Sequence, residues 1–202
     1  EKYFHTSFTI PNNISNGQHF FQVWAADNCG NMSVPVTVYF NVNKDVTAPT
    51  GTHSINPTNW TNGDVTITLN TTDDMSGVKR IKKPDGSYTY SVSTIYVVPA
   101  NGSYTFVLED NVGNTRNYTV TINNIDKTAP TIGGVENDRL YLSEVTPKAT
   151  DTNLKEVLLY KDNNQVQNYQ QNTQITEDGH YKLIAKDSAG NQTSVEFDIS
   201  RN

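Results

Sequence analysis

The sequence predicts an all-β chain in which several β-sandwich units follow one another. Apolar and polar residues alternate over short stretches, as at Tyr104, Phe106 and Leu108, which is the period of a half-buried strand. Tyrosine and phenylalanine are frequent, with 11 and 7 copies, and Asn and Gly fill the segments between the stretches. In addition, one strand–turn–strand pattern is written three times along the 202 residues.

The repeated pattern is an alternating strand, a turn of the form D-x-x-G-N and a second alternating strand. Its period of about 80 residues is longer than that of solenoid repeats and sufficient for one modest core, so we expect separate units. We interpret the turn as structural, because Asp caps tight turns and both Gly and Asn accept left-handed backbone geometry. The turn residues are Asp27, Gly30 and Asn31, then Asp110, Gly113 and Asn114, then Asp187, Gly190 and Asn191.

Two Thr-Ala-Pro segments, which end at Pro49 and Pro130, mark the joints between units. Proline fixes its own φ and keeps the preceding residue extended, so each joint should be short and semi-stiff. We therefore divide the chain into the C-terminal half of a unit at 1–48 and complete units at 49–130 and 131–202. Each complete unit should contain about seven short strands.

The first half-unit should expose an open edge. Tyr3 to Ile10 alternates as a strand, and Phe21, Val23 and Ala25 take the places of Tyr104, Phe106 and Leu108. Three strands cannot close a sandwich, and an unpaired edge is a template for association. We expect upstream strands of a longer parent protein, or a neighbouring chain, to cover this edge.

One stretch of the third unit is ambiguous between helix and strand. Leu154, Val157 and Leu158 have the i, i+3, i+4 spacing of a helix face. The equivalent stretch of the middle unit runs from Gly77 to Lys83, begins with glycine and is followed by Pro84, which suits a strand better. We therefore predict a strand here.

Composition and charge exclude several classes of function. The net charge of −6 argues against nucleic acid and anionic membranes as partners, because both require basic surfaces. No apolar run approaches 18 residues, so we expect no membrane insertion. Cys29 is the single cysteine, which rules out an intrachain disulfide. A cysteine-poor chain of this kind suits secreted proteins of Gram-positive bacteria better than animal ectodomains.

A glycine stands two residues before Tyr104 and Tyr181, at the start of the penultimate strand of each complete unit. This arrangement resembles the tyrosine corner of immunoglobulin-like sandwiches, with Phe106 and Leu183 where antibody domains have a cysteine. Together with the D-x-x-G-N turns and the joints, it makes the chain similar to tandem bacterial Ig-like domains. The resemblance implies an elongated array in a secreted or cell-surface bacterial protein. It implies a non-catalytic spacer that presents neighbouring domains of a larger parent.

No constellation of residues predicts an enzyme. The histidines at positions 5, 19, 53 and 180 show no metal-ligand spacing, and no pair of carboxylates is placed by a motif. No Ser/His/Asp pattern has a local signature. We therefore predict a chain with neither catalytic residues nor a cofactor.

Two binding alternatives remain open. Asp45 and Asp126 in the joints could meet an acidic loop of the next unit and hold calcium, although no EF-hand spacing supports this. An adhesion or carbohydrate-binding module would instead use exposed aromatic rings against a polysaccharide or a host surface protein, whereas cross-strand packing would bury such rings. The candidate rings are Trp24, Trp60, Tyr88, Tyr90 and Tyr169.

Overall fold

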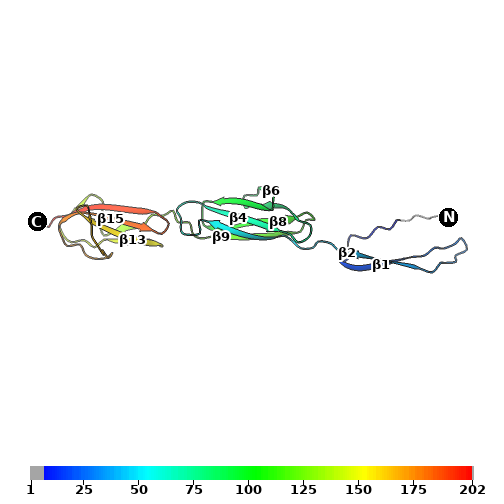
Figure 1. Ribbon diagram of the computed structural model, residues 1–202. Helices are drawn as coiled ribbons and strands as arrows, with labels where there is room; N and C mark the ends of the chain where they lie inside the picture. The colour runs from blue at the N-terminus through cyan, green and yellow to red at the C-terminus, as the bar shows by residue number, and fades with distance from the viewer. Residues whose placement is uncertain (1–6, 202) are drawn as a thin grey trace.

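The computed structural model describes residues 7–201 and contains sixteen β-strands and no helix in that range. The strands form three bodies in a row, with the N-terminus at one end and the C-terminus at the other (Figure 1). The predicted all-β class and the elongated row of units are confirmed. Within 7–201 there is accordingly no helix long and apolar enough to cross a membrane.

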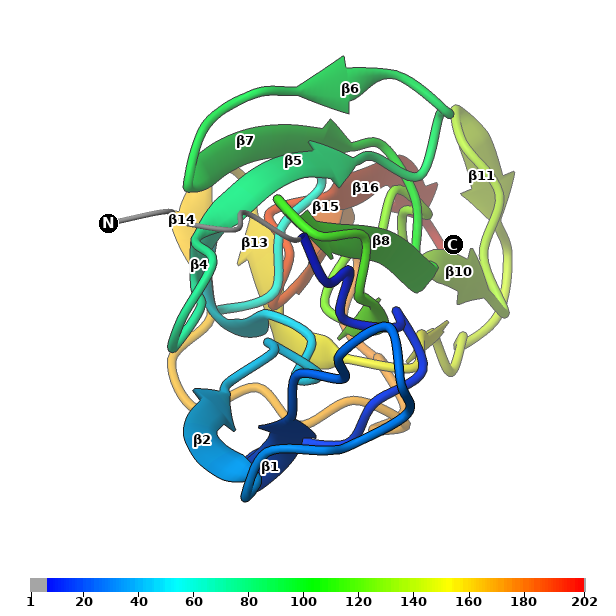
Figure 2. The ribbon, with the colours of Figure 1, turned by 90° about the vertical axis from the view of Figure 1, so that its right-hand side faces the viewer.

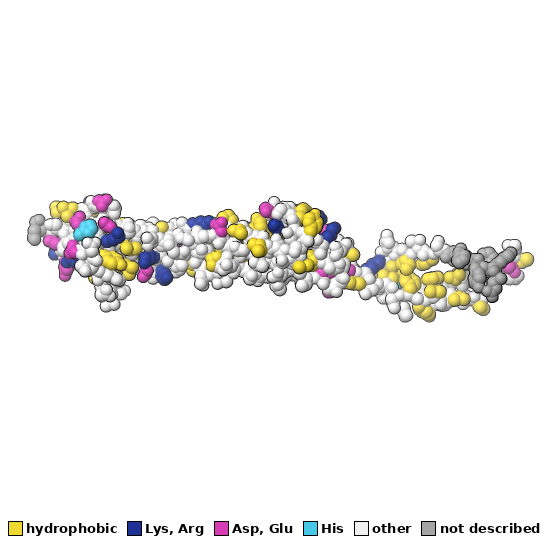
Figure 3. Space-filling view, turned by 45° about the horizontal axis from the view of Figure 1, so that its top comes forward, with side chains coloured by type: hydrophobic (Ala, Val, Ile, Leu, Met, Phe, Trp, Pro, Cys, Tyr) yellow, Lys and Arg dark blue, Asp and Glu magenta, His cyan; other side chains and the backbone are white. Residues whose placement is uncertain are grey.

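The first body is a single hairpin of β1 (Gly17–Val23) and β2 (Val36–Val42), paired antiparallel along their whole length. No second sheet faces it among residues 7–201. Apolar side chains such as Phe20, Val36 and Tyr39 are consequently exposed. Figure 3 shows hydrophobic side chains gathered on the surface of this body. The strand expected from Tyr3 to Ile10 is wrong for residues 7–10, which form no strand; residues 1–6 lie outside the described range.

The second unit is a sandwich of two sheets with seven strands. One sheet has the order β3-β4-β7 and the other the order β6-β5-β8-β9. The bounds are β3 (Thr50–Asn56), β4 (Val65–Thr72), β5 (Val78–Lys82), β6 (Tyr88–Thr89), β7 (Ser93–Val98), β8 (Gly102–Asp110) and β9 (Thr115–Ile122).

The core of the second unit lies between these sheets. Strand β4 turns Val65, Ile67 and Leu69 inward, and β8 meets them with Phe106 and Leu108, all fully buried. Alternate residues on both strands face outward, as the pleat of a strand requires. Strand β5 pairs with the other edge of β8, so the first strand of the repeated hairpin is covered on its edge as well as on its face.

The third unit also has seven strands, but its two sheets are unequal. Strands β10 (Thr131–Gly133) and β12 (Lys148–Thr150) pair with each other, and the larger sheet has the order β11-β16-β15-β13-β14. Figure 2 shows this unit behind the second one, seen along the row. The bounds are β11 (Arg139–Tyr141), β13 (Leu154–Lys161), β14 (Asn164–Gln165), β15 (Gly179–Asp187) and β16 (Gln192–Ile199).

Strand β13 is the stretch whose spacing also suited a helix, and the predicted strand is confirmed. It pairs antiparallel with β15 from Leu154 to Lys161. Leu159 is buried in the core of this unit, and Val157 packs against the same core. The tertiary pairing therefore decides the conformation of a segment whose local pattern fits both structures.

Both complete units contain a tyrosine bond at the start of the penultimate strand. The hydroxyl of Tyr104 donates to the backbone oxygen of Ala100 at 2.6 Å, and that of Tyr181 donates to Glu177 O at 2.9 Å. Gly179 at this corner takes a φ of 152°, a backbone conformation that favours glycine. These are the backbone contacts that hold a sandwich corner closed.

Candidate functional site

In the D-x-x-G-N turn of the second unit, both carboxylate oxygens of Asp110 accept hydrogen bonds from within the turn. Asp110 is fully buried, and its Oδ1 accepts from the backbone nitrogens of Val112, Gly113 and Asn114 at 2.6–2.9 Å. Its Oδ2 accepts from Nδ2 of Asn114 at 2.7 Å. Burial raises the pKa of Asp110, but these hydrogen bonds outweigh burial and hold the pKa below its ordinary value. Gly113 takes a φ of 101°, a conformation that favours glycine.

The last residue of the third unit's turn reaches beyond the turn. Nδ2 of Asn191 donates to Oδ2 of Asp187 at 2.7 Å. It also lies 2.9 Å from the backbone oxygen of Asp126 and 3.2 Å from that of Thr128, both in the joint before the unit. One side chain therefore fastens the joint to the unit that follows it.

The joint before the second unit repeats this arrangement. Nδ2 of Asn114 donates to the backbone oxygen of Thr47 at 3.1 Å and approaches that of Asp45 at 3.4 Å. Oδ2 of Asp45 accepts from the backbone nitrogen of Ser76 at 3.0 Å, and the hydroxyl of Thr47 donates to Asp74 at 2.5 Å. We call the contacts of Asn114 and Asn191 with these joints the joint clamps.

Each joint also brings three carboxylates together, with one oxygen of each within 4.8 Å of the others. Carboxylate oxygens are the ligands that calcium prefers. Calcium at the joints stays a prediction, which a calorimetric titration tests: heat that Asp126→Asn reduces and Asp27→Asn does not would support it, and no heat would contradict it. The clusters are Asp45, Asp73 and Asp74 in the first joint, and Asp126, Asp151 and Asp187 in the second.

The five candidate rings for carbohydrate do not form one surface, because they are distributed over all three bodies. Trp24, on the first hairpin, is 51% exposed, and Trp60, in the second unit, is 42% exposed. Tyr88 lies under the guanidinium of Arg80, 4.5 Å from it, and Tyr90 is exposed. Tyr169 differs from the expectation: it packs against the core of the third unit and is no free ring.

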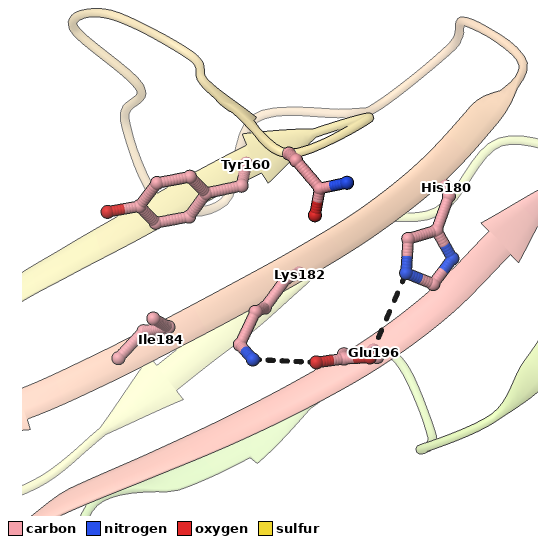
Figure 4. Close-up of a pocket in the computed structure, with 6 residues that line it drawn as sticks. Tyr160, His180, Lys182, Ile184 and Glu196 are labelled. Carbon is pink, nitrogen blue, oxygen red and sulfur yellow. Dashed lines mark hydrogen bonds and ion pairs between the residues drawn. The ribbon is translucent and has the colours of Figure 1, made fainter.

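A shallow cleft of about 350 Å³ lies on the outer face of the third unit (Figure 4). Nζ of Lys182 lies 2.7 Å from Oε1 of Glu196, and Nδ1 of His180 lies 2.9 Å from Oδ1 of Asp198. The bond with Asp198 raises the pKa of His180 above its ordinary value. Tyr160 borders the other side of the cleft. These are cross-strand charge pairs on neighbouring strands, an arrangement that stabilises a sheet.

The joint clamps are the feature that sequence reasoning missed. Asn114 and Asn191 were predicted as turn residues, but their bonds to the preceding joint were not. The sequence does contain a signal for these bonds, because two motifs occur together. A D-x-T-A-P joint precedes each of the two complete units, and each of these units ends with a D-x-x-G-N hairpin.

Comparisons with known proteins give a limited set of similarities. No protein-family model matches the chain. A stretch of 74 residues is 42% identical to part of the outer cell wall protein of Brevibacillus brevis; it covers 37% of this chain and spans 7% of that protein's length.

Two solved structures are similar at low identity. The fibronectin(III)-like modules of Clostridium thermocellum CbhA are 14% identical, with a TM-score of 0.32 over 73% of this chain and 93% of that one. The N-terminal four Ig domains of Dscam1 isoform 4.44 are 13% identical, with a TM-score of 0.35 over 90% of this chain and 54% of that one.

Proposed function

We propose that this chain is a non-catalytic spacer, made of tandem bacterial Ig-like units, in a secreted or cell-surface bacterial protein. The observation that carries the proposal is the joint clamp, which occurs with the same donor and the same kind of acceptors at both joints. A joint fastened to the following unit limits the angles that neighbouring units can adopt. The partial identity with an outer cell wall protein supports a location at the cell surface.

The proposed mechanism is mechanical. Each complete unit closes its sandwich with its own core, and its turn fastens the joint that precedes it. A row of such units projects whatever follows it away from the point of attachment. The partners are then the neighbouring domains of a longer protein. A polysaccharide or a host surface protein would be met by the domain that is presented.

The test is the relative motion of the second and third units in the full chain. Residual dipolar couplings should give both units the same alignment tensor, and small-angle X-ray scattering should give the maximum dimension of a rod. Asn191→Ala removes the side chain that holds Asp126 and Thr128, so the two tensors should diverge and the maximum dimension should fall.

Asn31→Ala is the matched control, because the side chain of Asn31 donates within its own turn, to Asp27. This variant should leave the couplings of the second and third units unchanged. Divergent tensors in the unmodified chain, or an Asn191→Ala chain as stiff as the parent with both units folded, would contradict the spacer proposal.

A further inference from the structure

An open cleft of about 550 Å³ lies where the second unit meets the third. Two segments of the second unit form most of its wall: the loop after β3 and the residues after β9. The two segments are held together by the backbone nitrogen of Thr61, which donates to Asn124 O at 3.0 Å. The residues around the cleft are Thr58, Asn59, Trp60, Asn123, Asn124 and Ser188.

The third unit contributes directly to this cleft. Ser188 belongs to its D-x-x-G-N turn, and the neighbouring Ala189 accepts a hydrogen bond at 3.1 Å from the backbone nitrogen of Asn62. The second joint clamp, at Asn191, fixes the same turn against the linker. The cleft is therefore a product of the unit–unit junction, which Figure 1 shows between the second and third bodies. Ligand sites occur preferentially at such boundaries.

The cleft has the composition of a site for a neutral, hydroxyl-rich ligand. None of its six side chains is charged; they supply one indole ring, three amides and two hydroxyls. An amide both donates and accepts hydrogen bonds, which matches a sugar hydroxyl that does the same. Trp60 keeps 42% of its surface exposed, so its ring offers an apolar face at the same place.

Asn124 braces the wall of the cleft. Its side chain is only 8% exposed, and its Nδ2 donates to the backbone oxygens of Pro57 and Asn59, both at 2.9 Å. Two carbonyl acceptors fix which end of the amide is nitrogen. The carbonyl oxygen Oδ1 then has no hydrogen-bond partner among the described residues. This oxygen is itself buried, so a ligand in the cleft does not reach it. The part of Asn124 is to tie the loop after β3 to the residues after β9, which shapes the wall of the cleft.

We propose that the junction cleft binds a neutral carbohydrate. The indole of Trp60 stacks on the apolar face of a sugar ring, and the amides of Asn59 and Asn123 bind its hydroxyls. This inference goes beyond the spacer proposal, because it assigns a ligand to the boundary between two units whose stiffness is measured separately.

The test uses the two tryptophans of the full chain. In a Trp24→Phe background, the fluorescence of Trp60 alone reports on the cleft during titration with cellohexaose and with chitohexaose, two neutral β-linked hexasaccharides. We expect saturable binding of at least one of them, a shift of the emission maximum, and no binding of an anionic oligogalacturonate. Comparison of the two neutral sugars shows whether an N-acetyl group contributes.

Matched variants, measured by isothermal titration calorimetry, distinguish binding in this cleft from non-specific binding elsewhere on the chain. Trp60→Ala should weaken binding at least tenfold, and Trp24→Ala should leave it unchanged, because Trp24 is similarly exposed but belongs to the first hairpin. Asn123→Ala offers a second variant that keeps the fold, since Asn123 is exposed, and it should weaken binding several-fold. Failure of both neutral hexasaccharides to bind at millimolar concentration, or equal binding by Trp60→Ala, would overturn the proposal.

Discussion

The same turn occurs in a hairpin without a partner sheet and in two complete sandwiches. In the first hairpin, Oδ1 of Asp27 accepts from the backbone nitrogens of Cys29 and Asn31, both at 2.9 Å, and its Oδ2 accepts from Nδ2 of Asn31 at 2.8 Å. Asp110 makes the same bonds in the second unit. Nevertheless Asp27 is exposed, whereas Asp110 is completely buried.

This comparison shows that the five-residue sequence specifies the hydrogen bonds of the turn, whereas the burial of its carboxylate is specified by the whole unit. Five residues with Asp first and Gly-Asn last close the turn at all three places where the pattern occurs in this chain, because the side chain of the Asp accepts from backbone nitrogens of the turn. Burial of the carboxylate and the clamp on the joint require a second sheet and a preceding linker. The turns of the first hairpin and the second unit therefore differ in energy although they agree in geometry.

The largest expected effect is at the core position of the repeated hairpin. Phe106 is fully buried, whereas Val23, in the equivalent place, is 43% exposed. Phe106→Ala should cost the second unit about 3–5 kcal/mol, because it leaves a cavity between two sheets. Val23→Ala should change stability by less than about 0.5 kcal/mol. Urea unfolding followed by Trp60 fluorescence in a Trp24→Phe background measures the second unit, and Trp24 fluorescence in a Trp60→Phe background follows the first hairpin. Similar losses from both variants would contradict the comparison.

The next largest effect is the loss of stability of the second unit at acidic pH, to which Asp110 contributes. Hydrogen bonds hold the pKa of Asp110 below 3.8 despite burial, so its contribution to folding is fully present above that value. The contribution is lost as pH falls through the lower folded pKa. Asp110→Asn places an amide against Nδ2 of Asn114, two donors face to face, so it should destabilise the second unit and flatten this part of its acid profile.

The same substitution in the first hairpin gives the control. Asp27 also has a lowered pKa, chiefly from the side chain of Asn31, but it is exposed, so water replaces the lost bonds. Thermal melts of both variants between pH 2 and pH 6 make the measurement. An Asp110→Asn chain with the parent's acid profile would count against this account.

Alternation and turn chemistry were sufficient to predict most of the strands. They predicted β13 correctly even though the spacing of Leu154, Val157 and Leu158 also suits a helix. Strand β3 was missed, because Thr50–Asn56 contains one large apolar residue, Ile55, and is defined instead by its pairing with β4. Tyr3 to Ile10 shows the opposite case: its alternation is clear, but residues 7–10 form no strand, and Phe8 instead stacks on Phe21 of β1 with ring centroids 5.2 Å apart.

The candidate sites depended on contacts between segments far apart in the sequence. Trp24 is exposed because no second sheet faces the first hairpin among residues 7–201, so residues on both of its faces, such as Val23 and Trp24, meet solvent. The packing of Tyr169 against the core depends on how its loop folds back. The cleft beside Trp60 needs Ser188 from the next unit. No local pattern encodes such an approach, because it depends on the angle that the joint gives to two units.

A smaller effect is expected at the tyrosine corner. Phe21 of the first hairpin stands where Tyr104 stands in the second unit, so the first hairpin has no hydroxyl for a corner bond. Tyr104→Phe makes the second unit resemble the first at this place and removes the bond to Ala100 O. The expected loss is about 1 kcal/mol in urea unfolding, the usual value of one hydrogen bond. Tyr104→Phe keeps the aromatic ring and removes only the hydroxyl. A loss of unfolding free energy as large as that from Phe106→Ala would therefore show that the hydroxyl contributes more than one hydrogen bond.

The smallest effect distinguishes the two complete units from each other. His180 and Asp198 are directly opposite on β15 and β16, with the ring nitrogen 2.9 Å from the carboxylate. The corresponding pair in the second unit is neutral: Ser103 and Thr121, whose hydroxyls lie 3.4 Å apart. The third unit therefore carries an ion pair that depends on protonation of a histidine, at a place where the second unit has none.

The bond with Asp198 raises the pKa of His180 above 6.5, so its contribution to stability is complete below about pH 6.5. The contribution is lost as pH rises through the higher folded pKa. NMR titration of the His180 ring should show this raised pKa, and Asp198→Asn should lower it toward the ordinary value. Both groups are about half exposed, so the change in melting temperature of the third unit should be small, and the second unit should show no change over the same pH range. An unshifted pKa of His180 in the parent chain would mean that the ion pair does not form in solution, and the two units would then respond alike to pH.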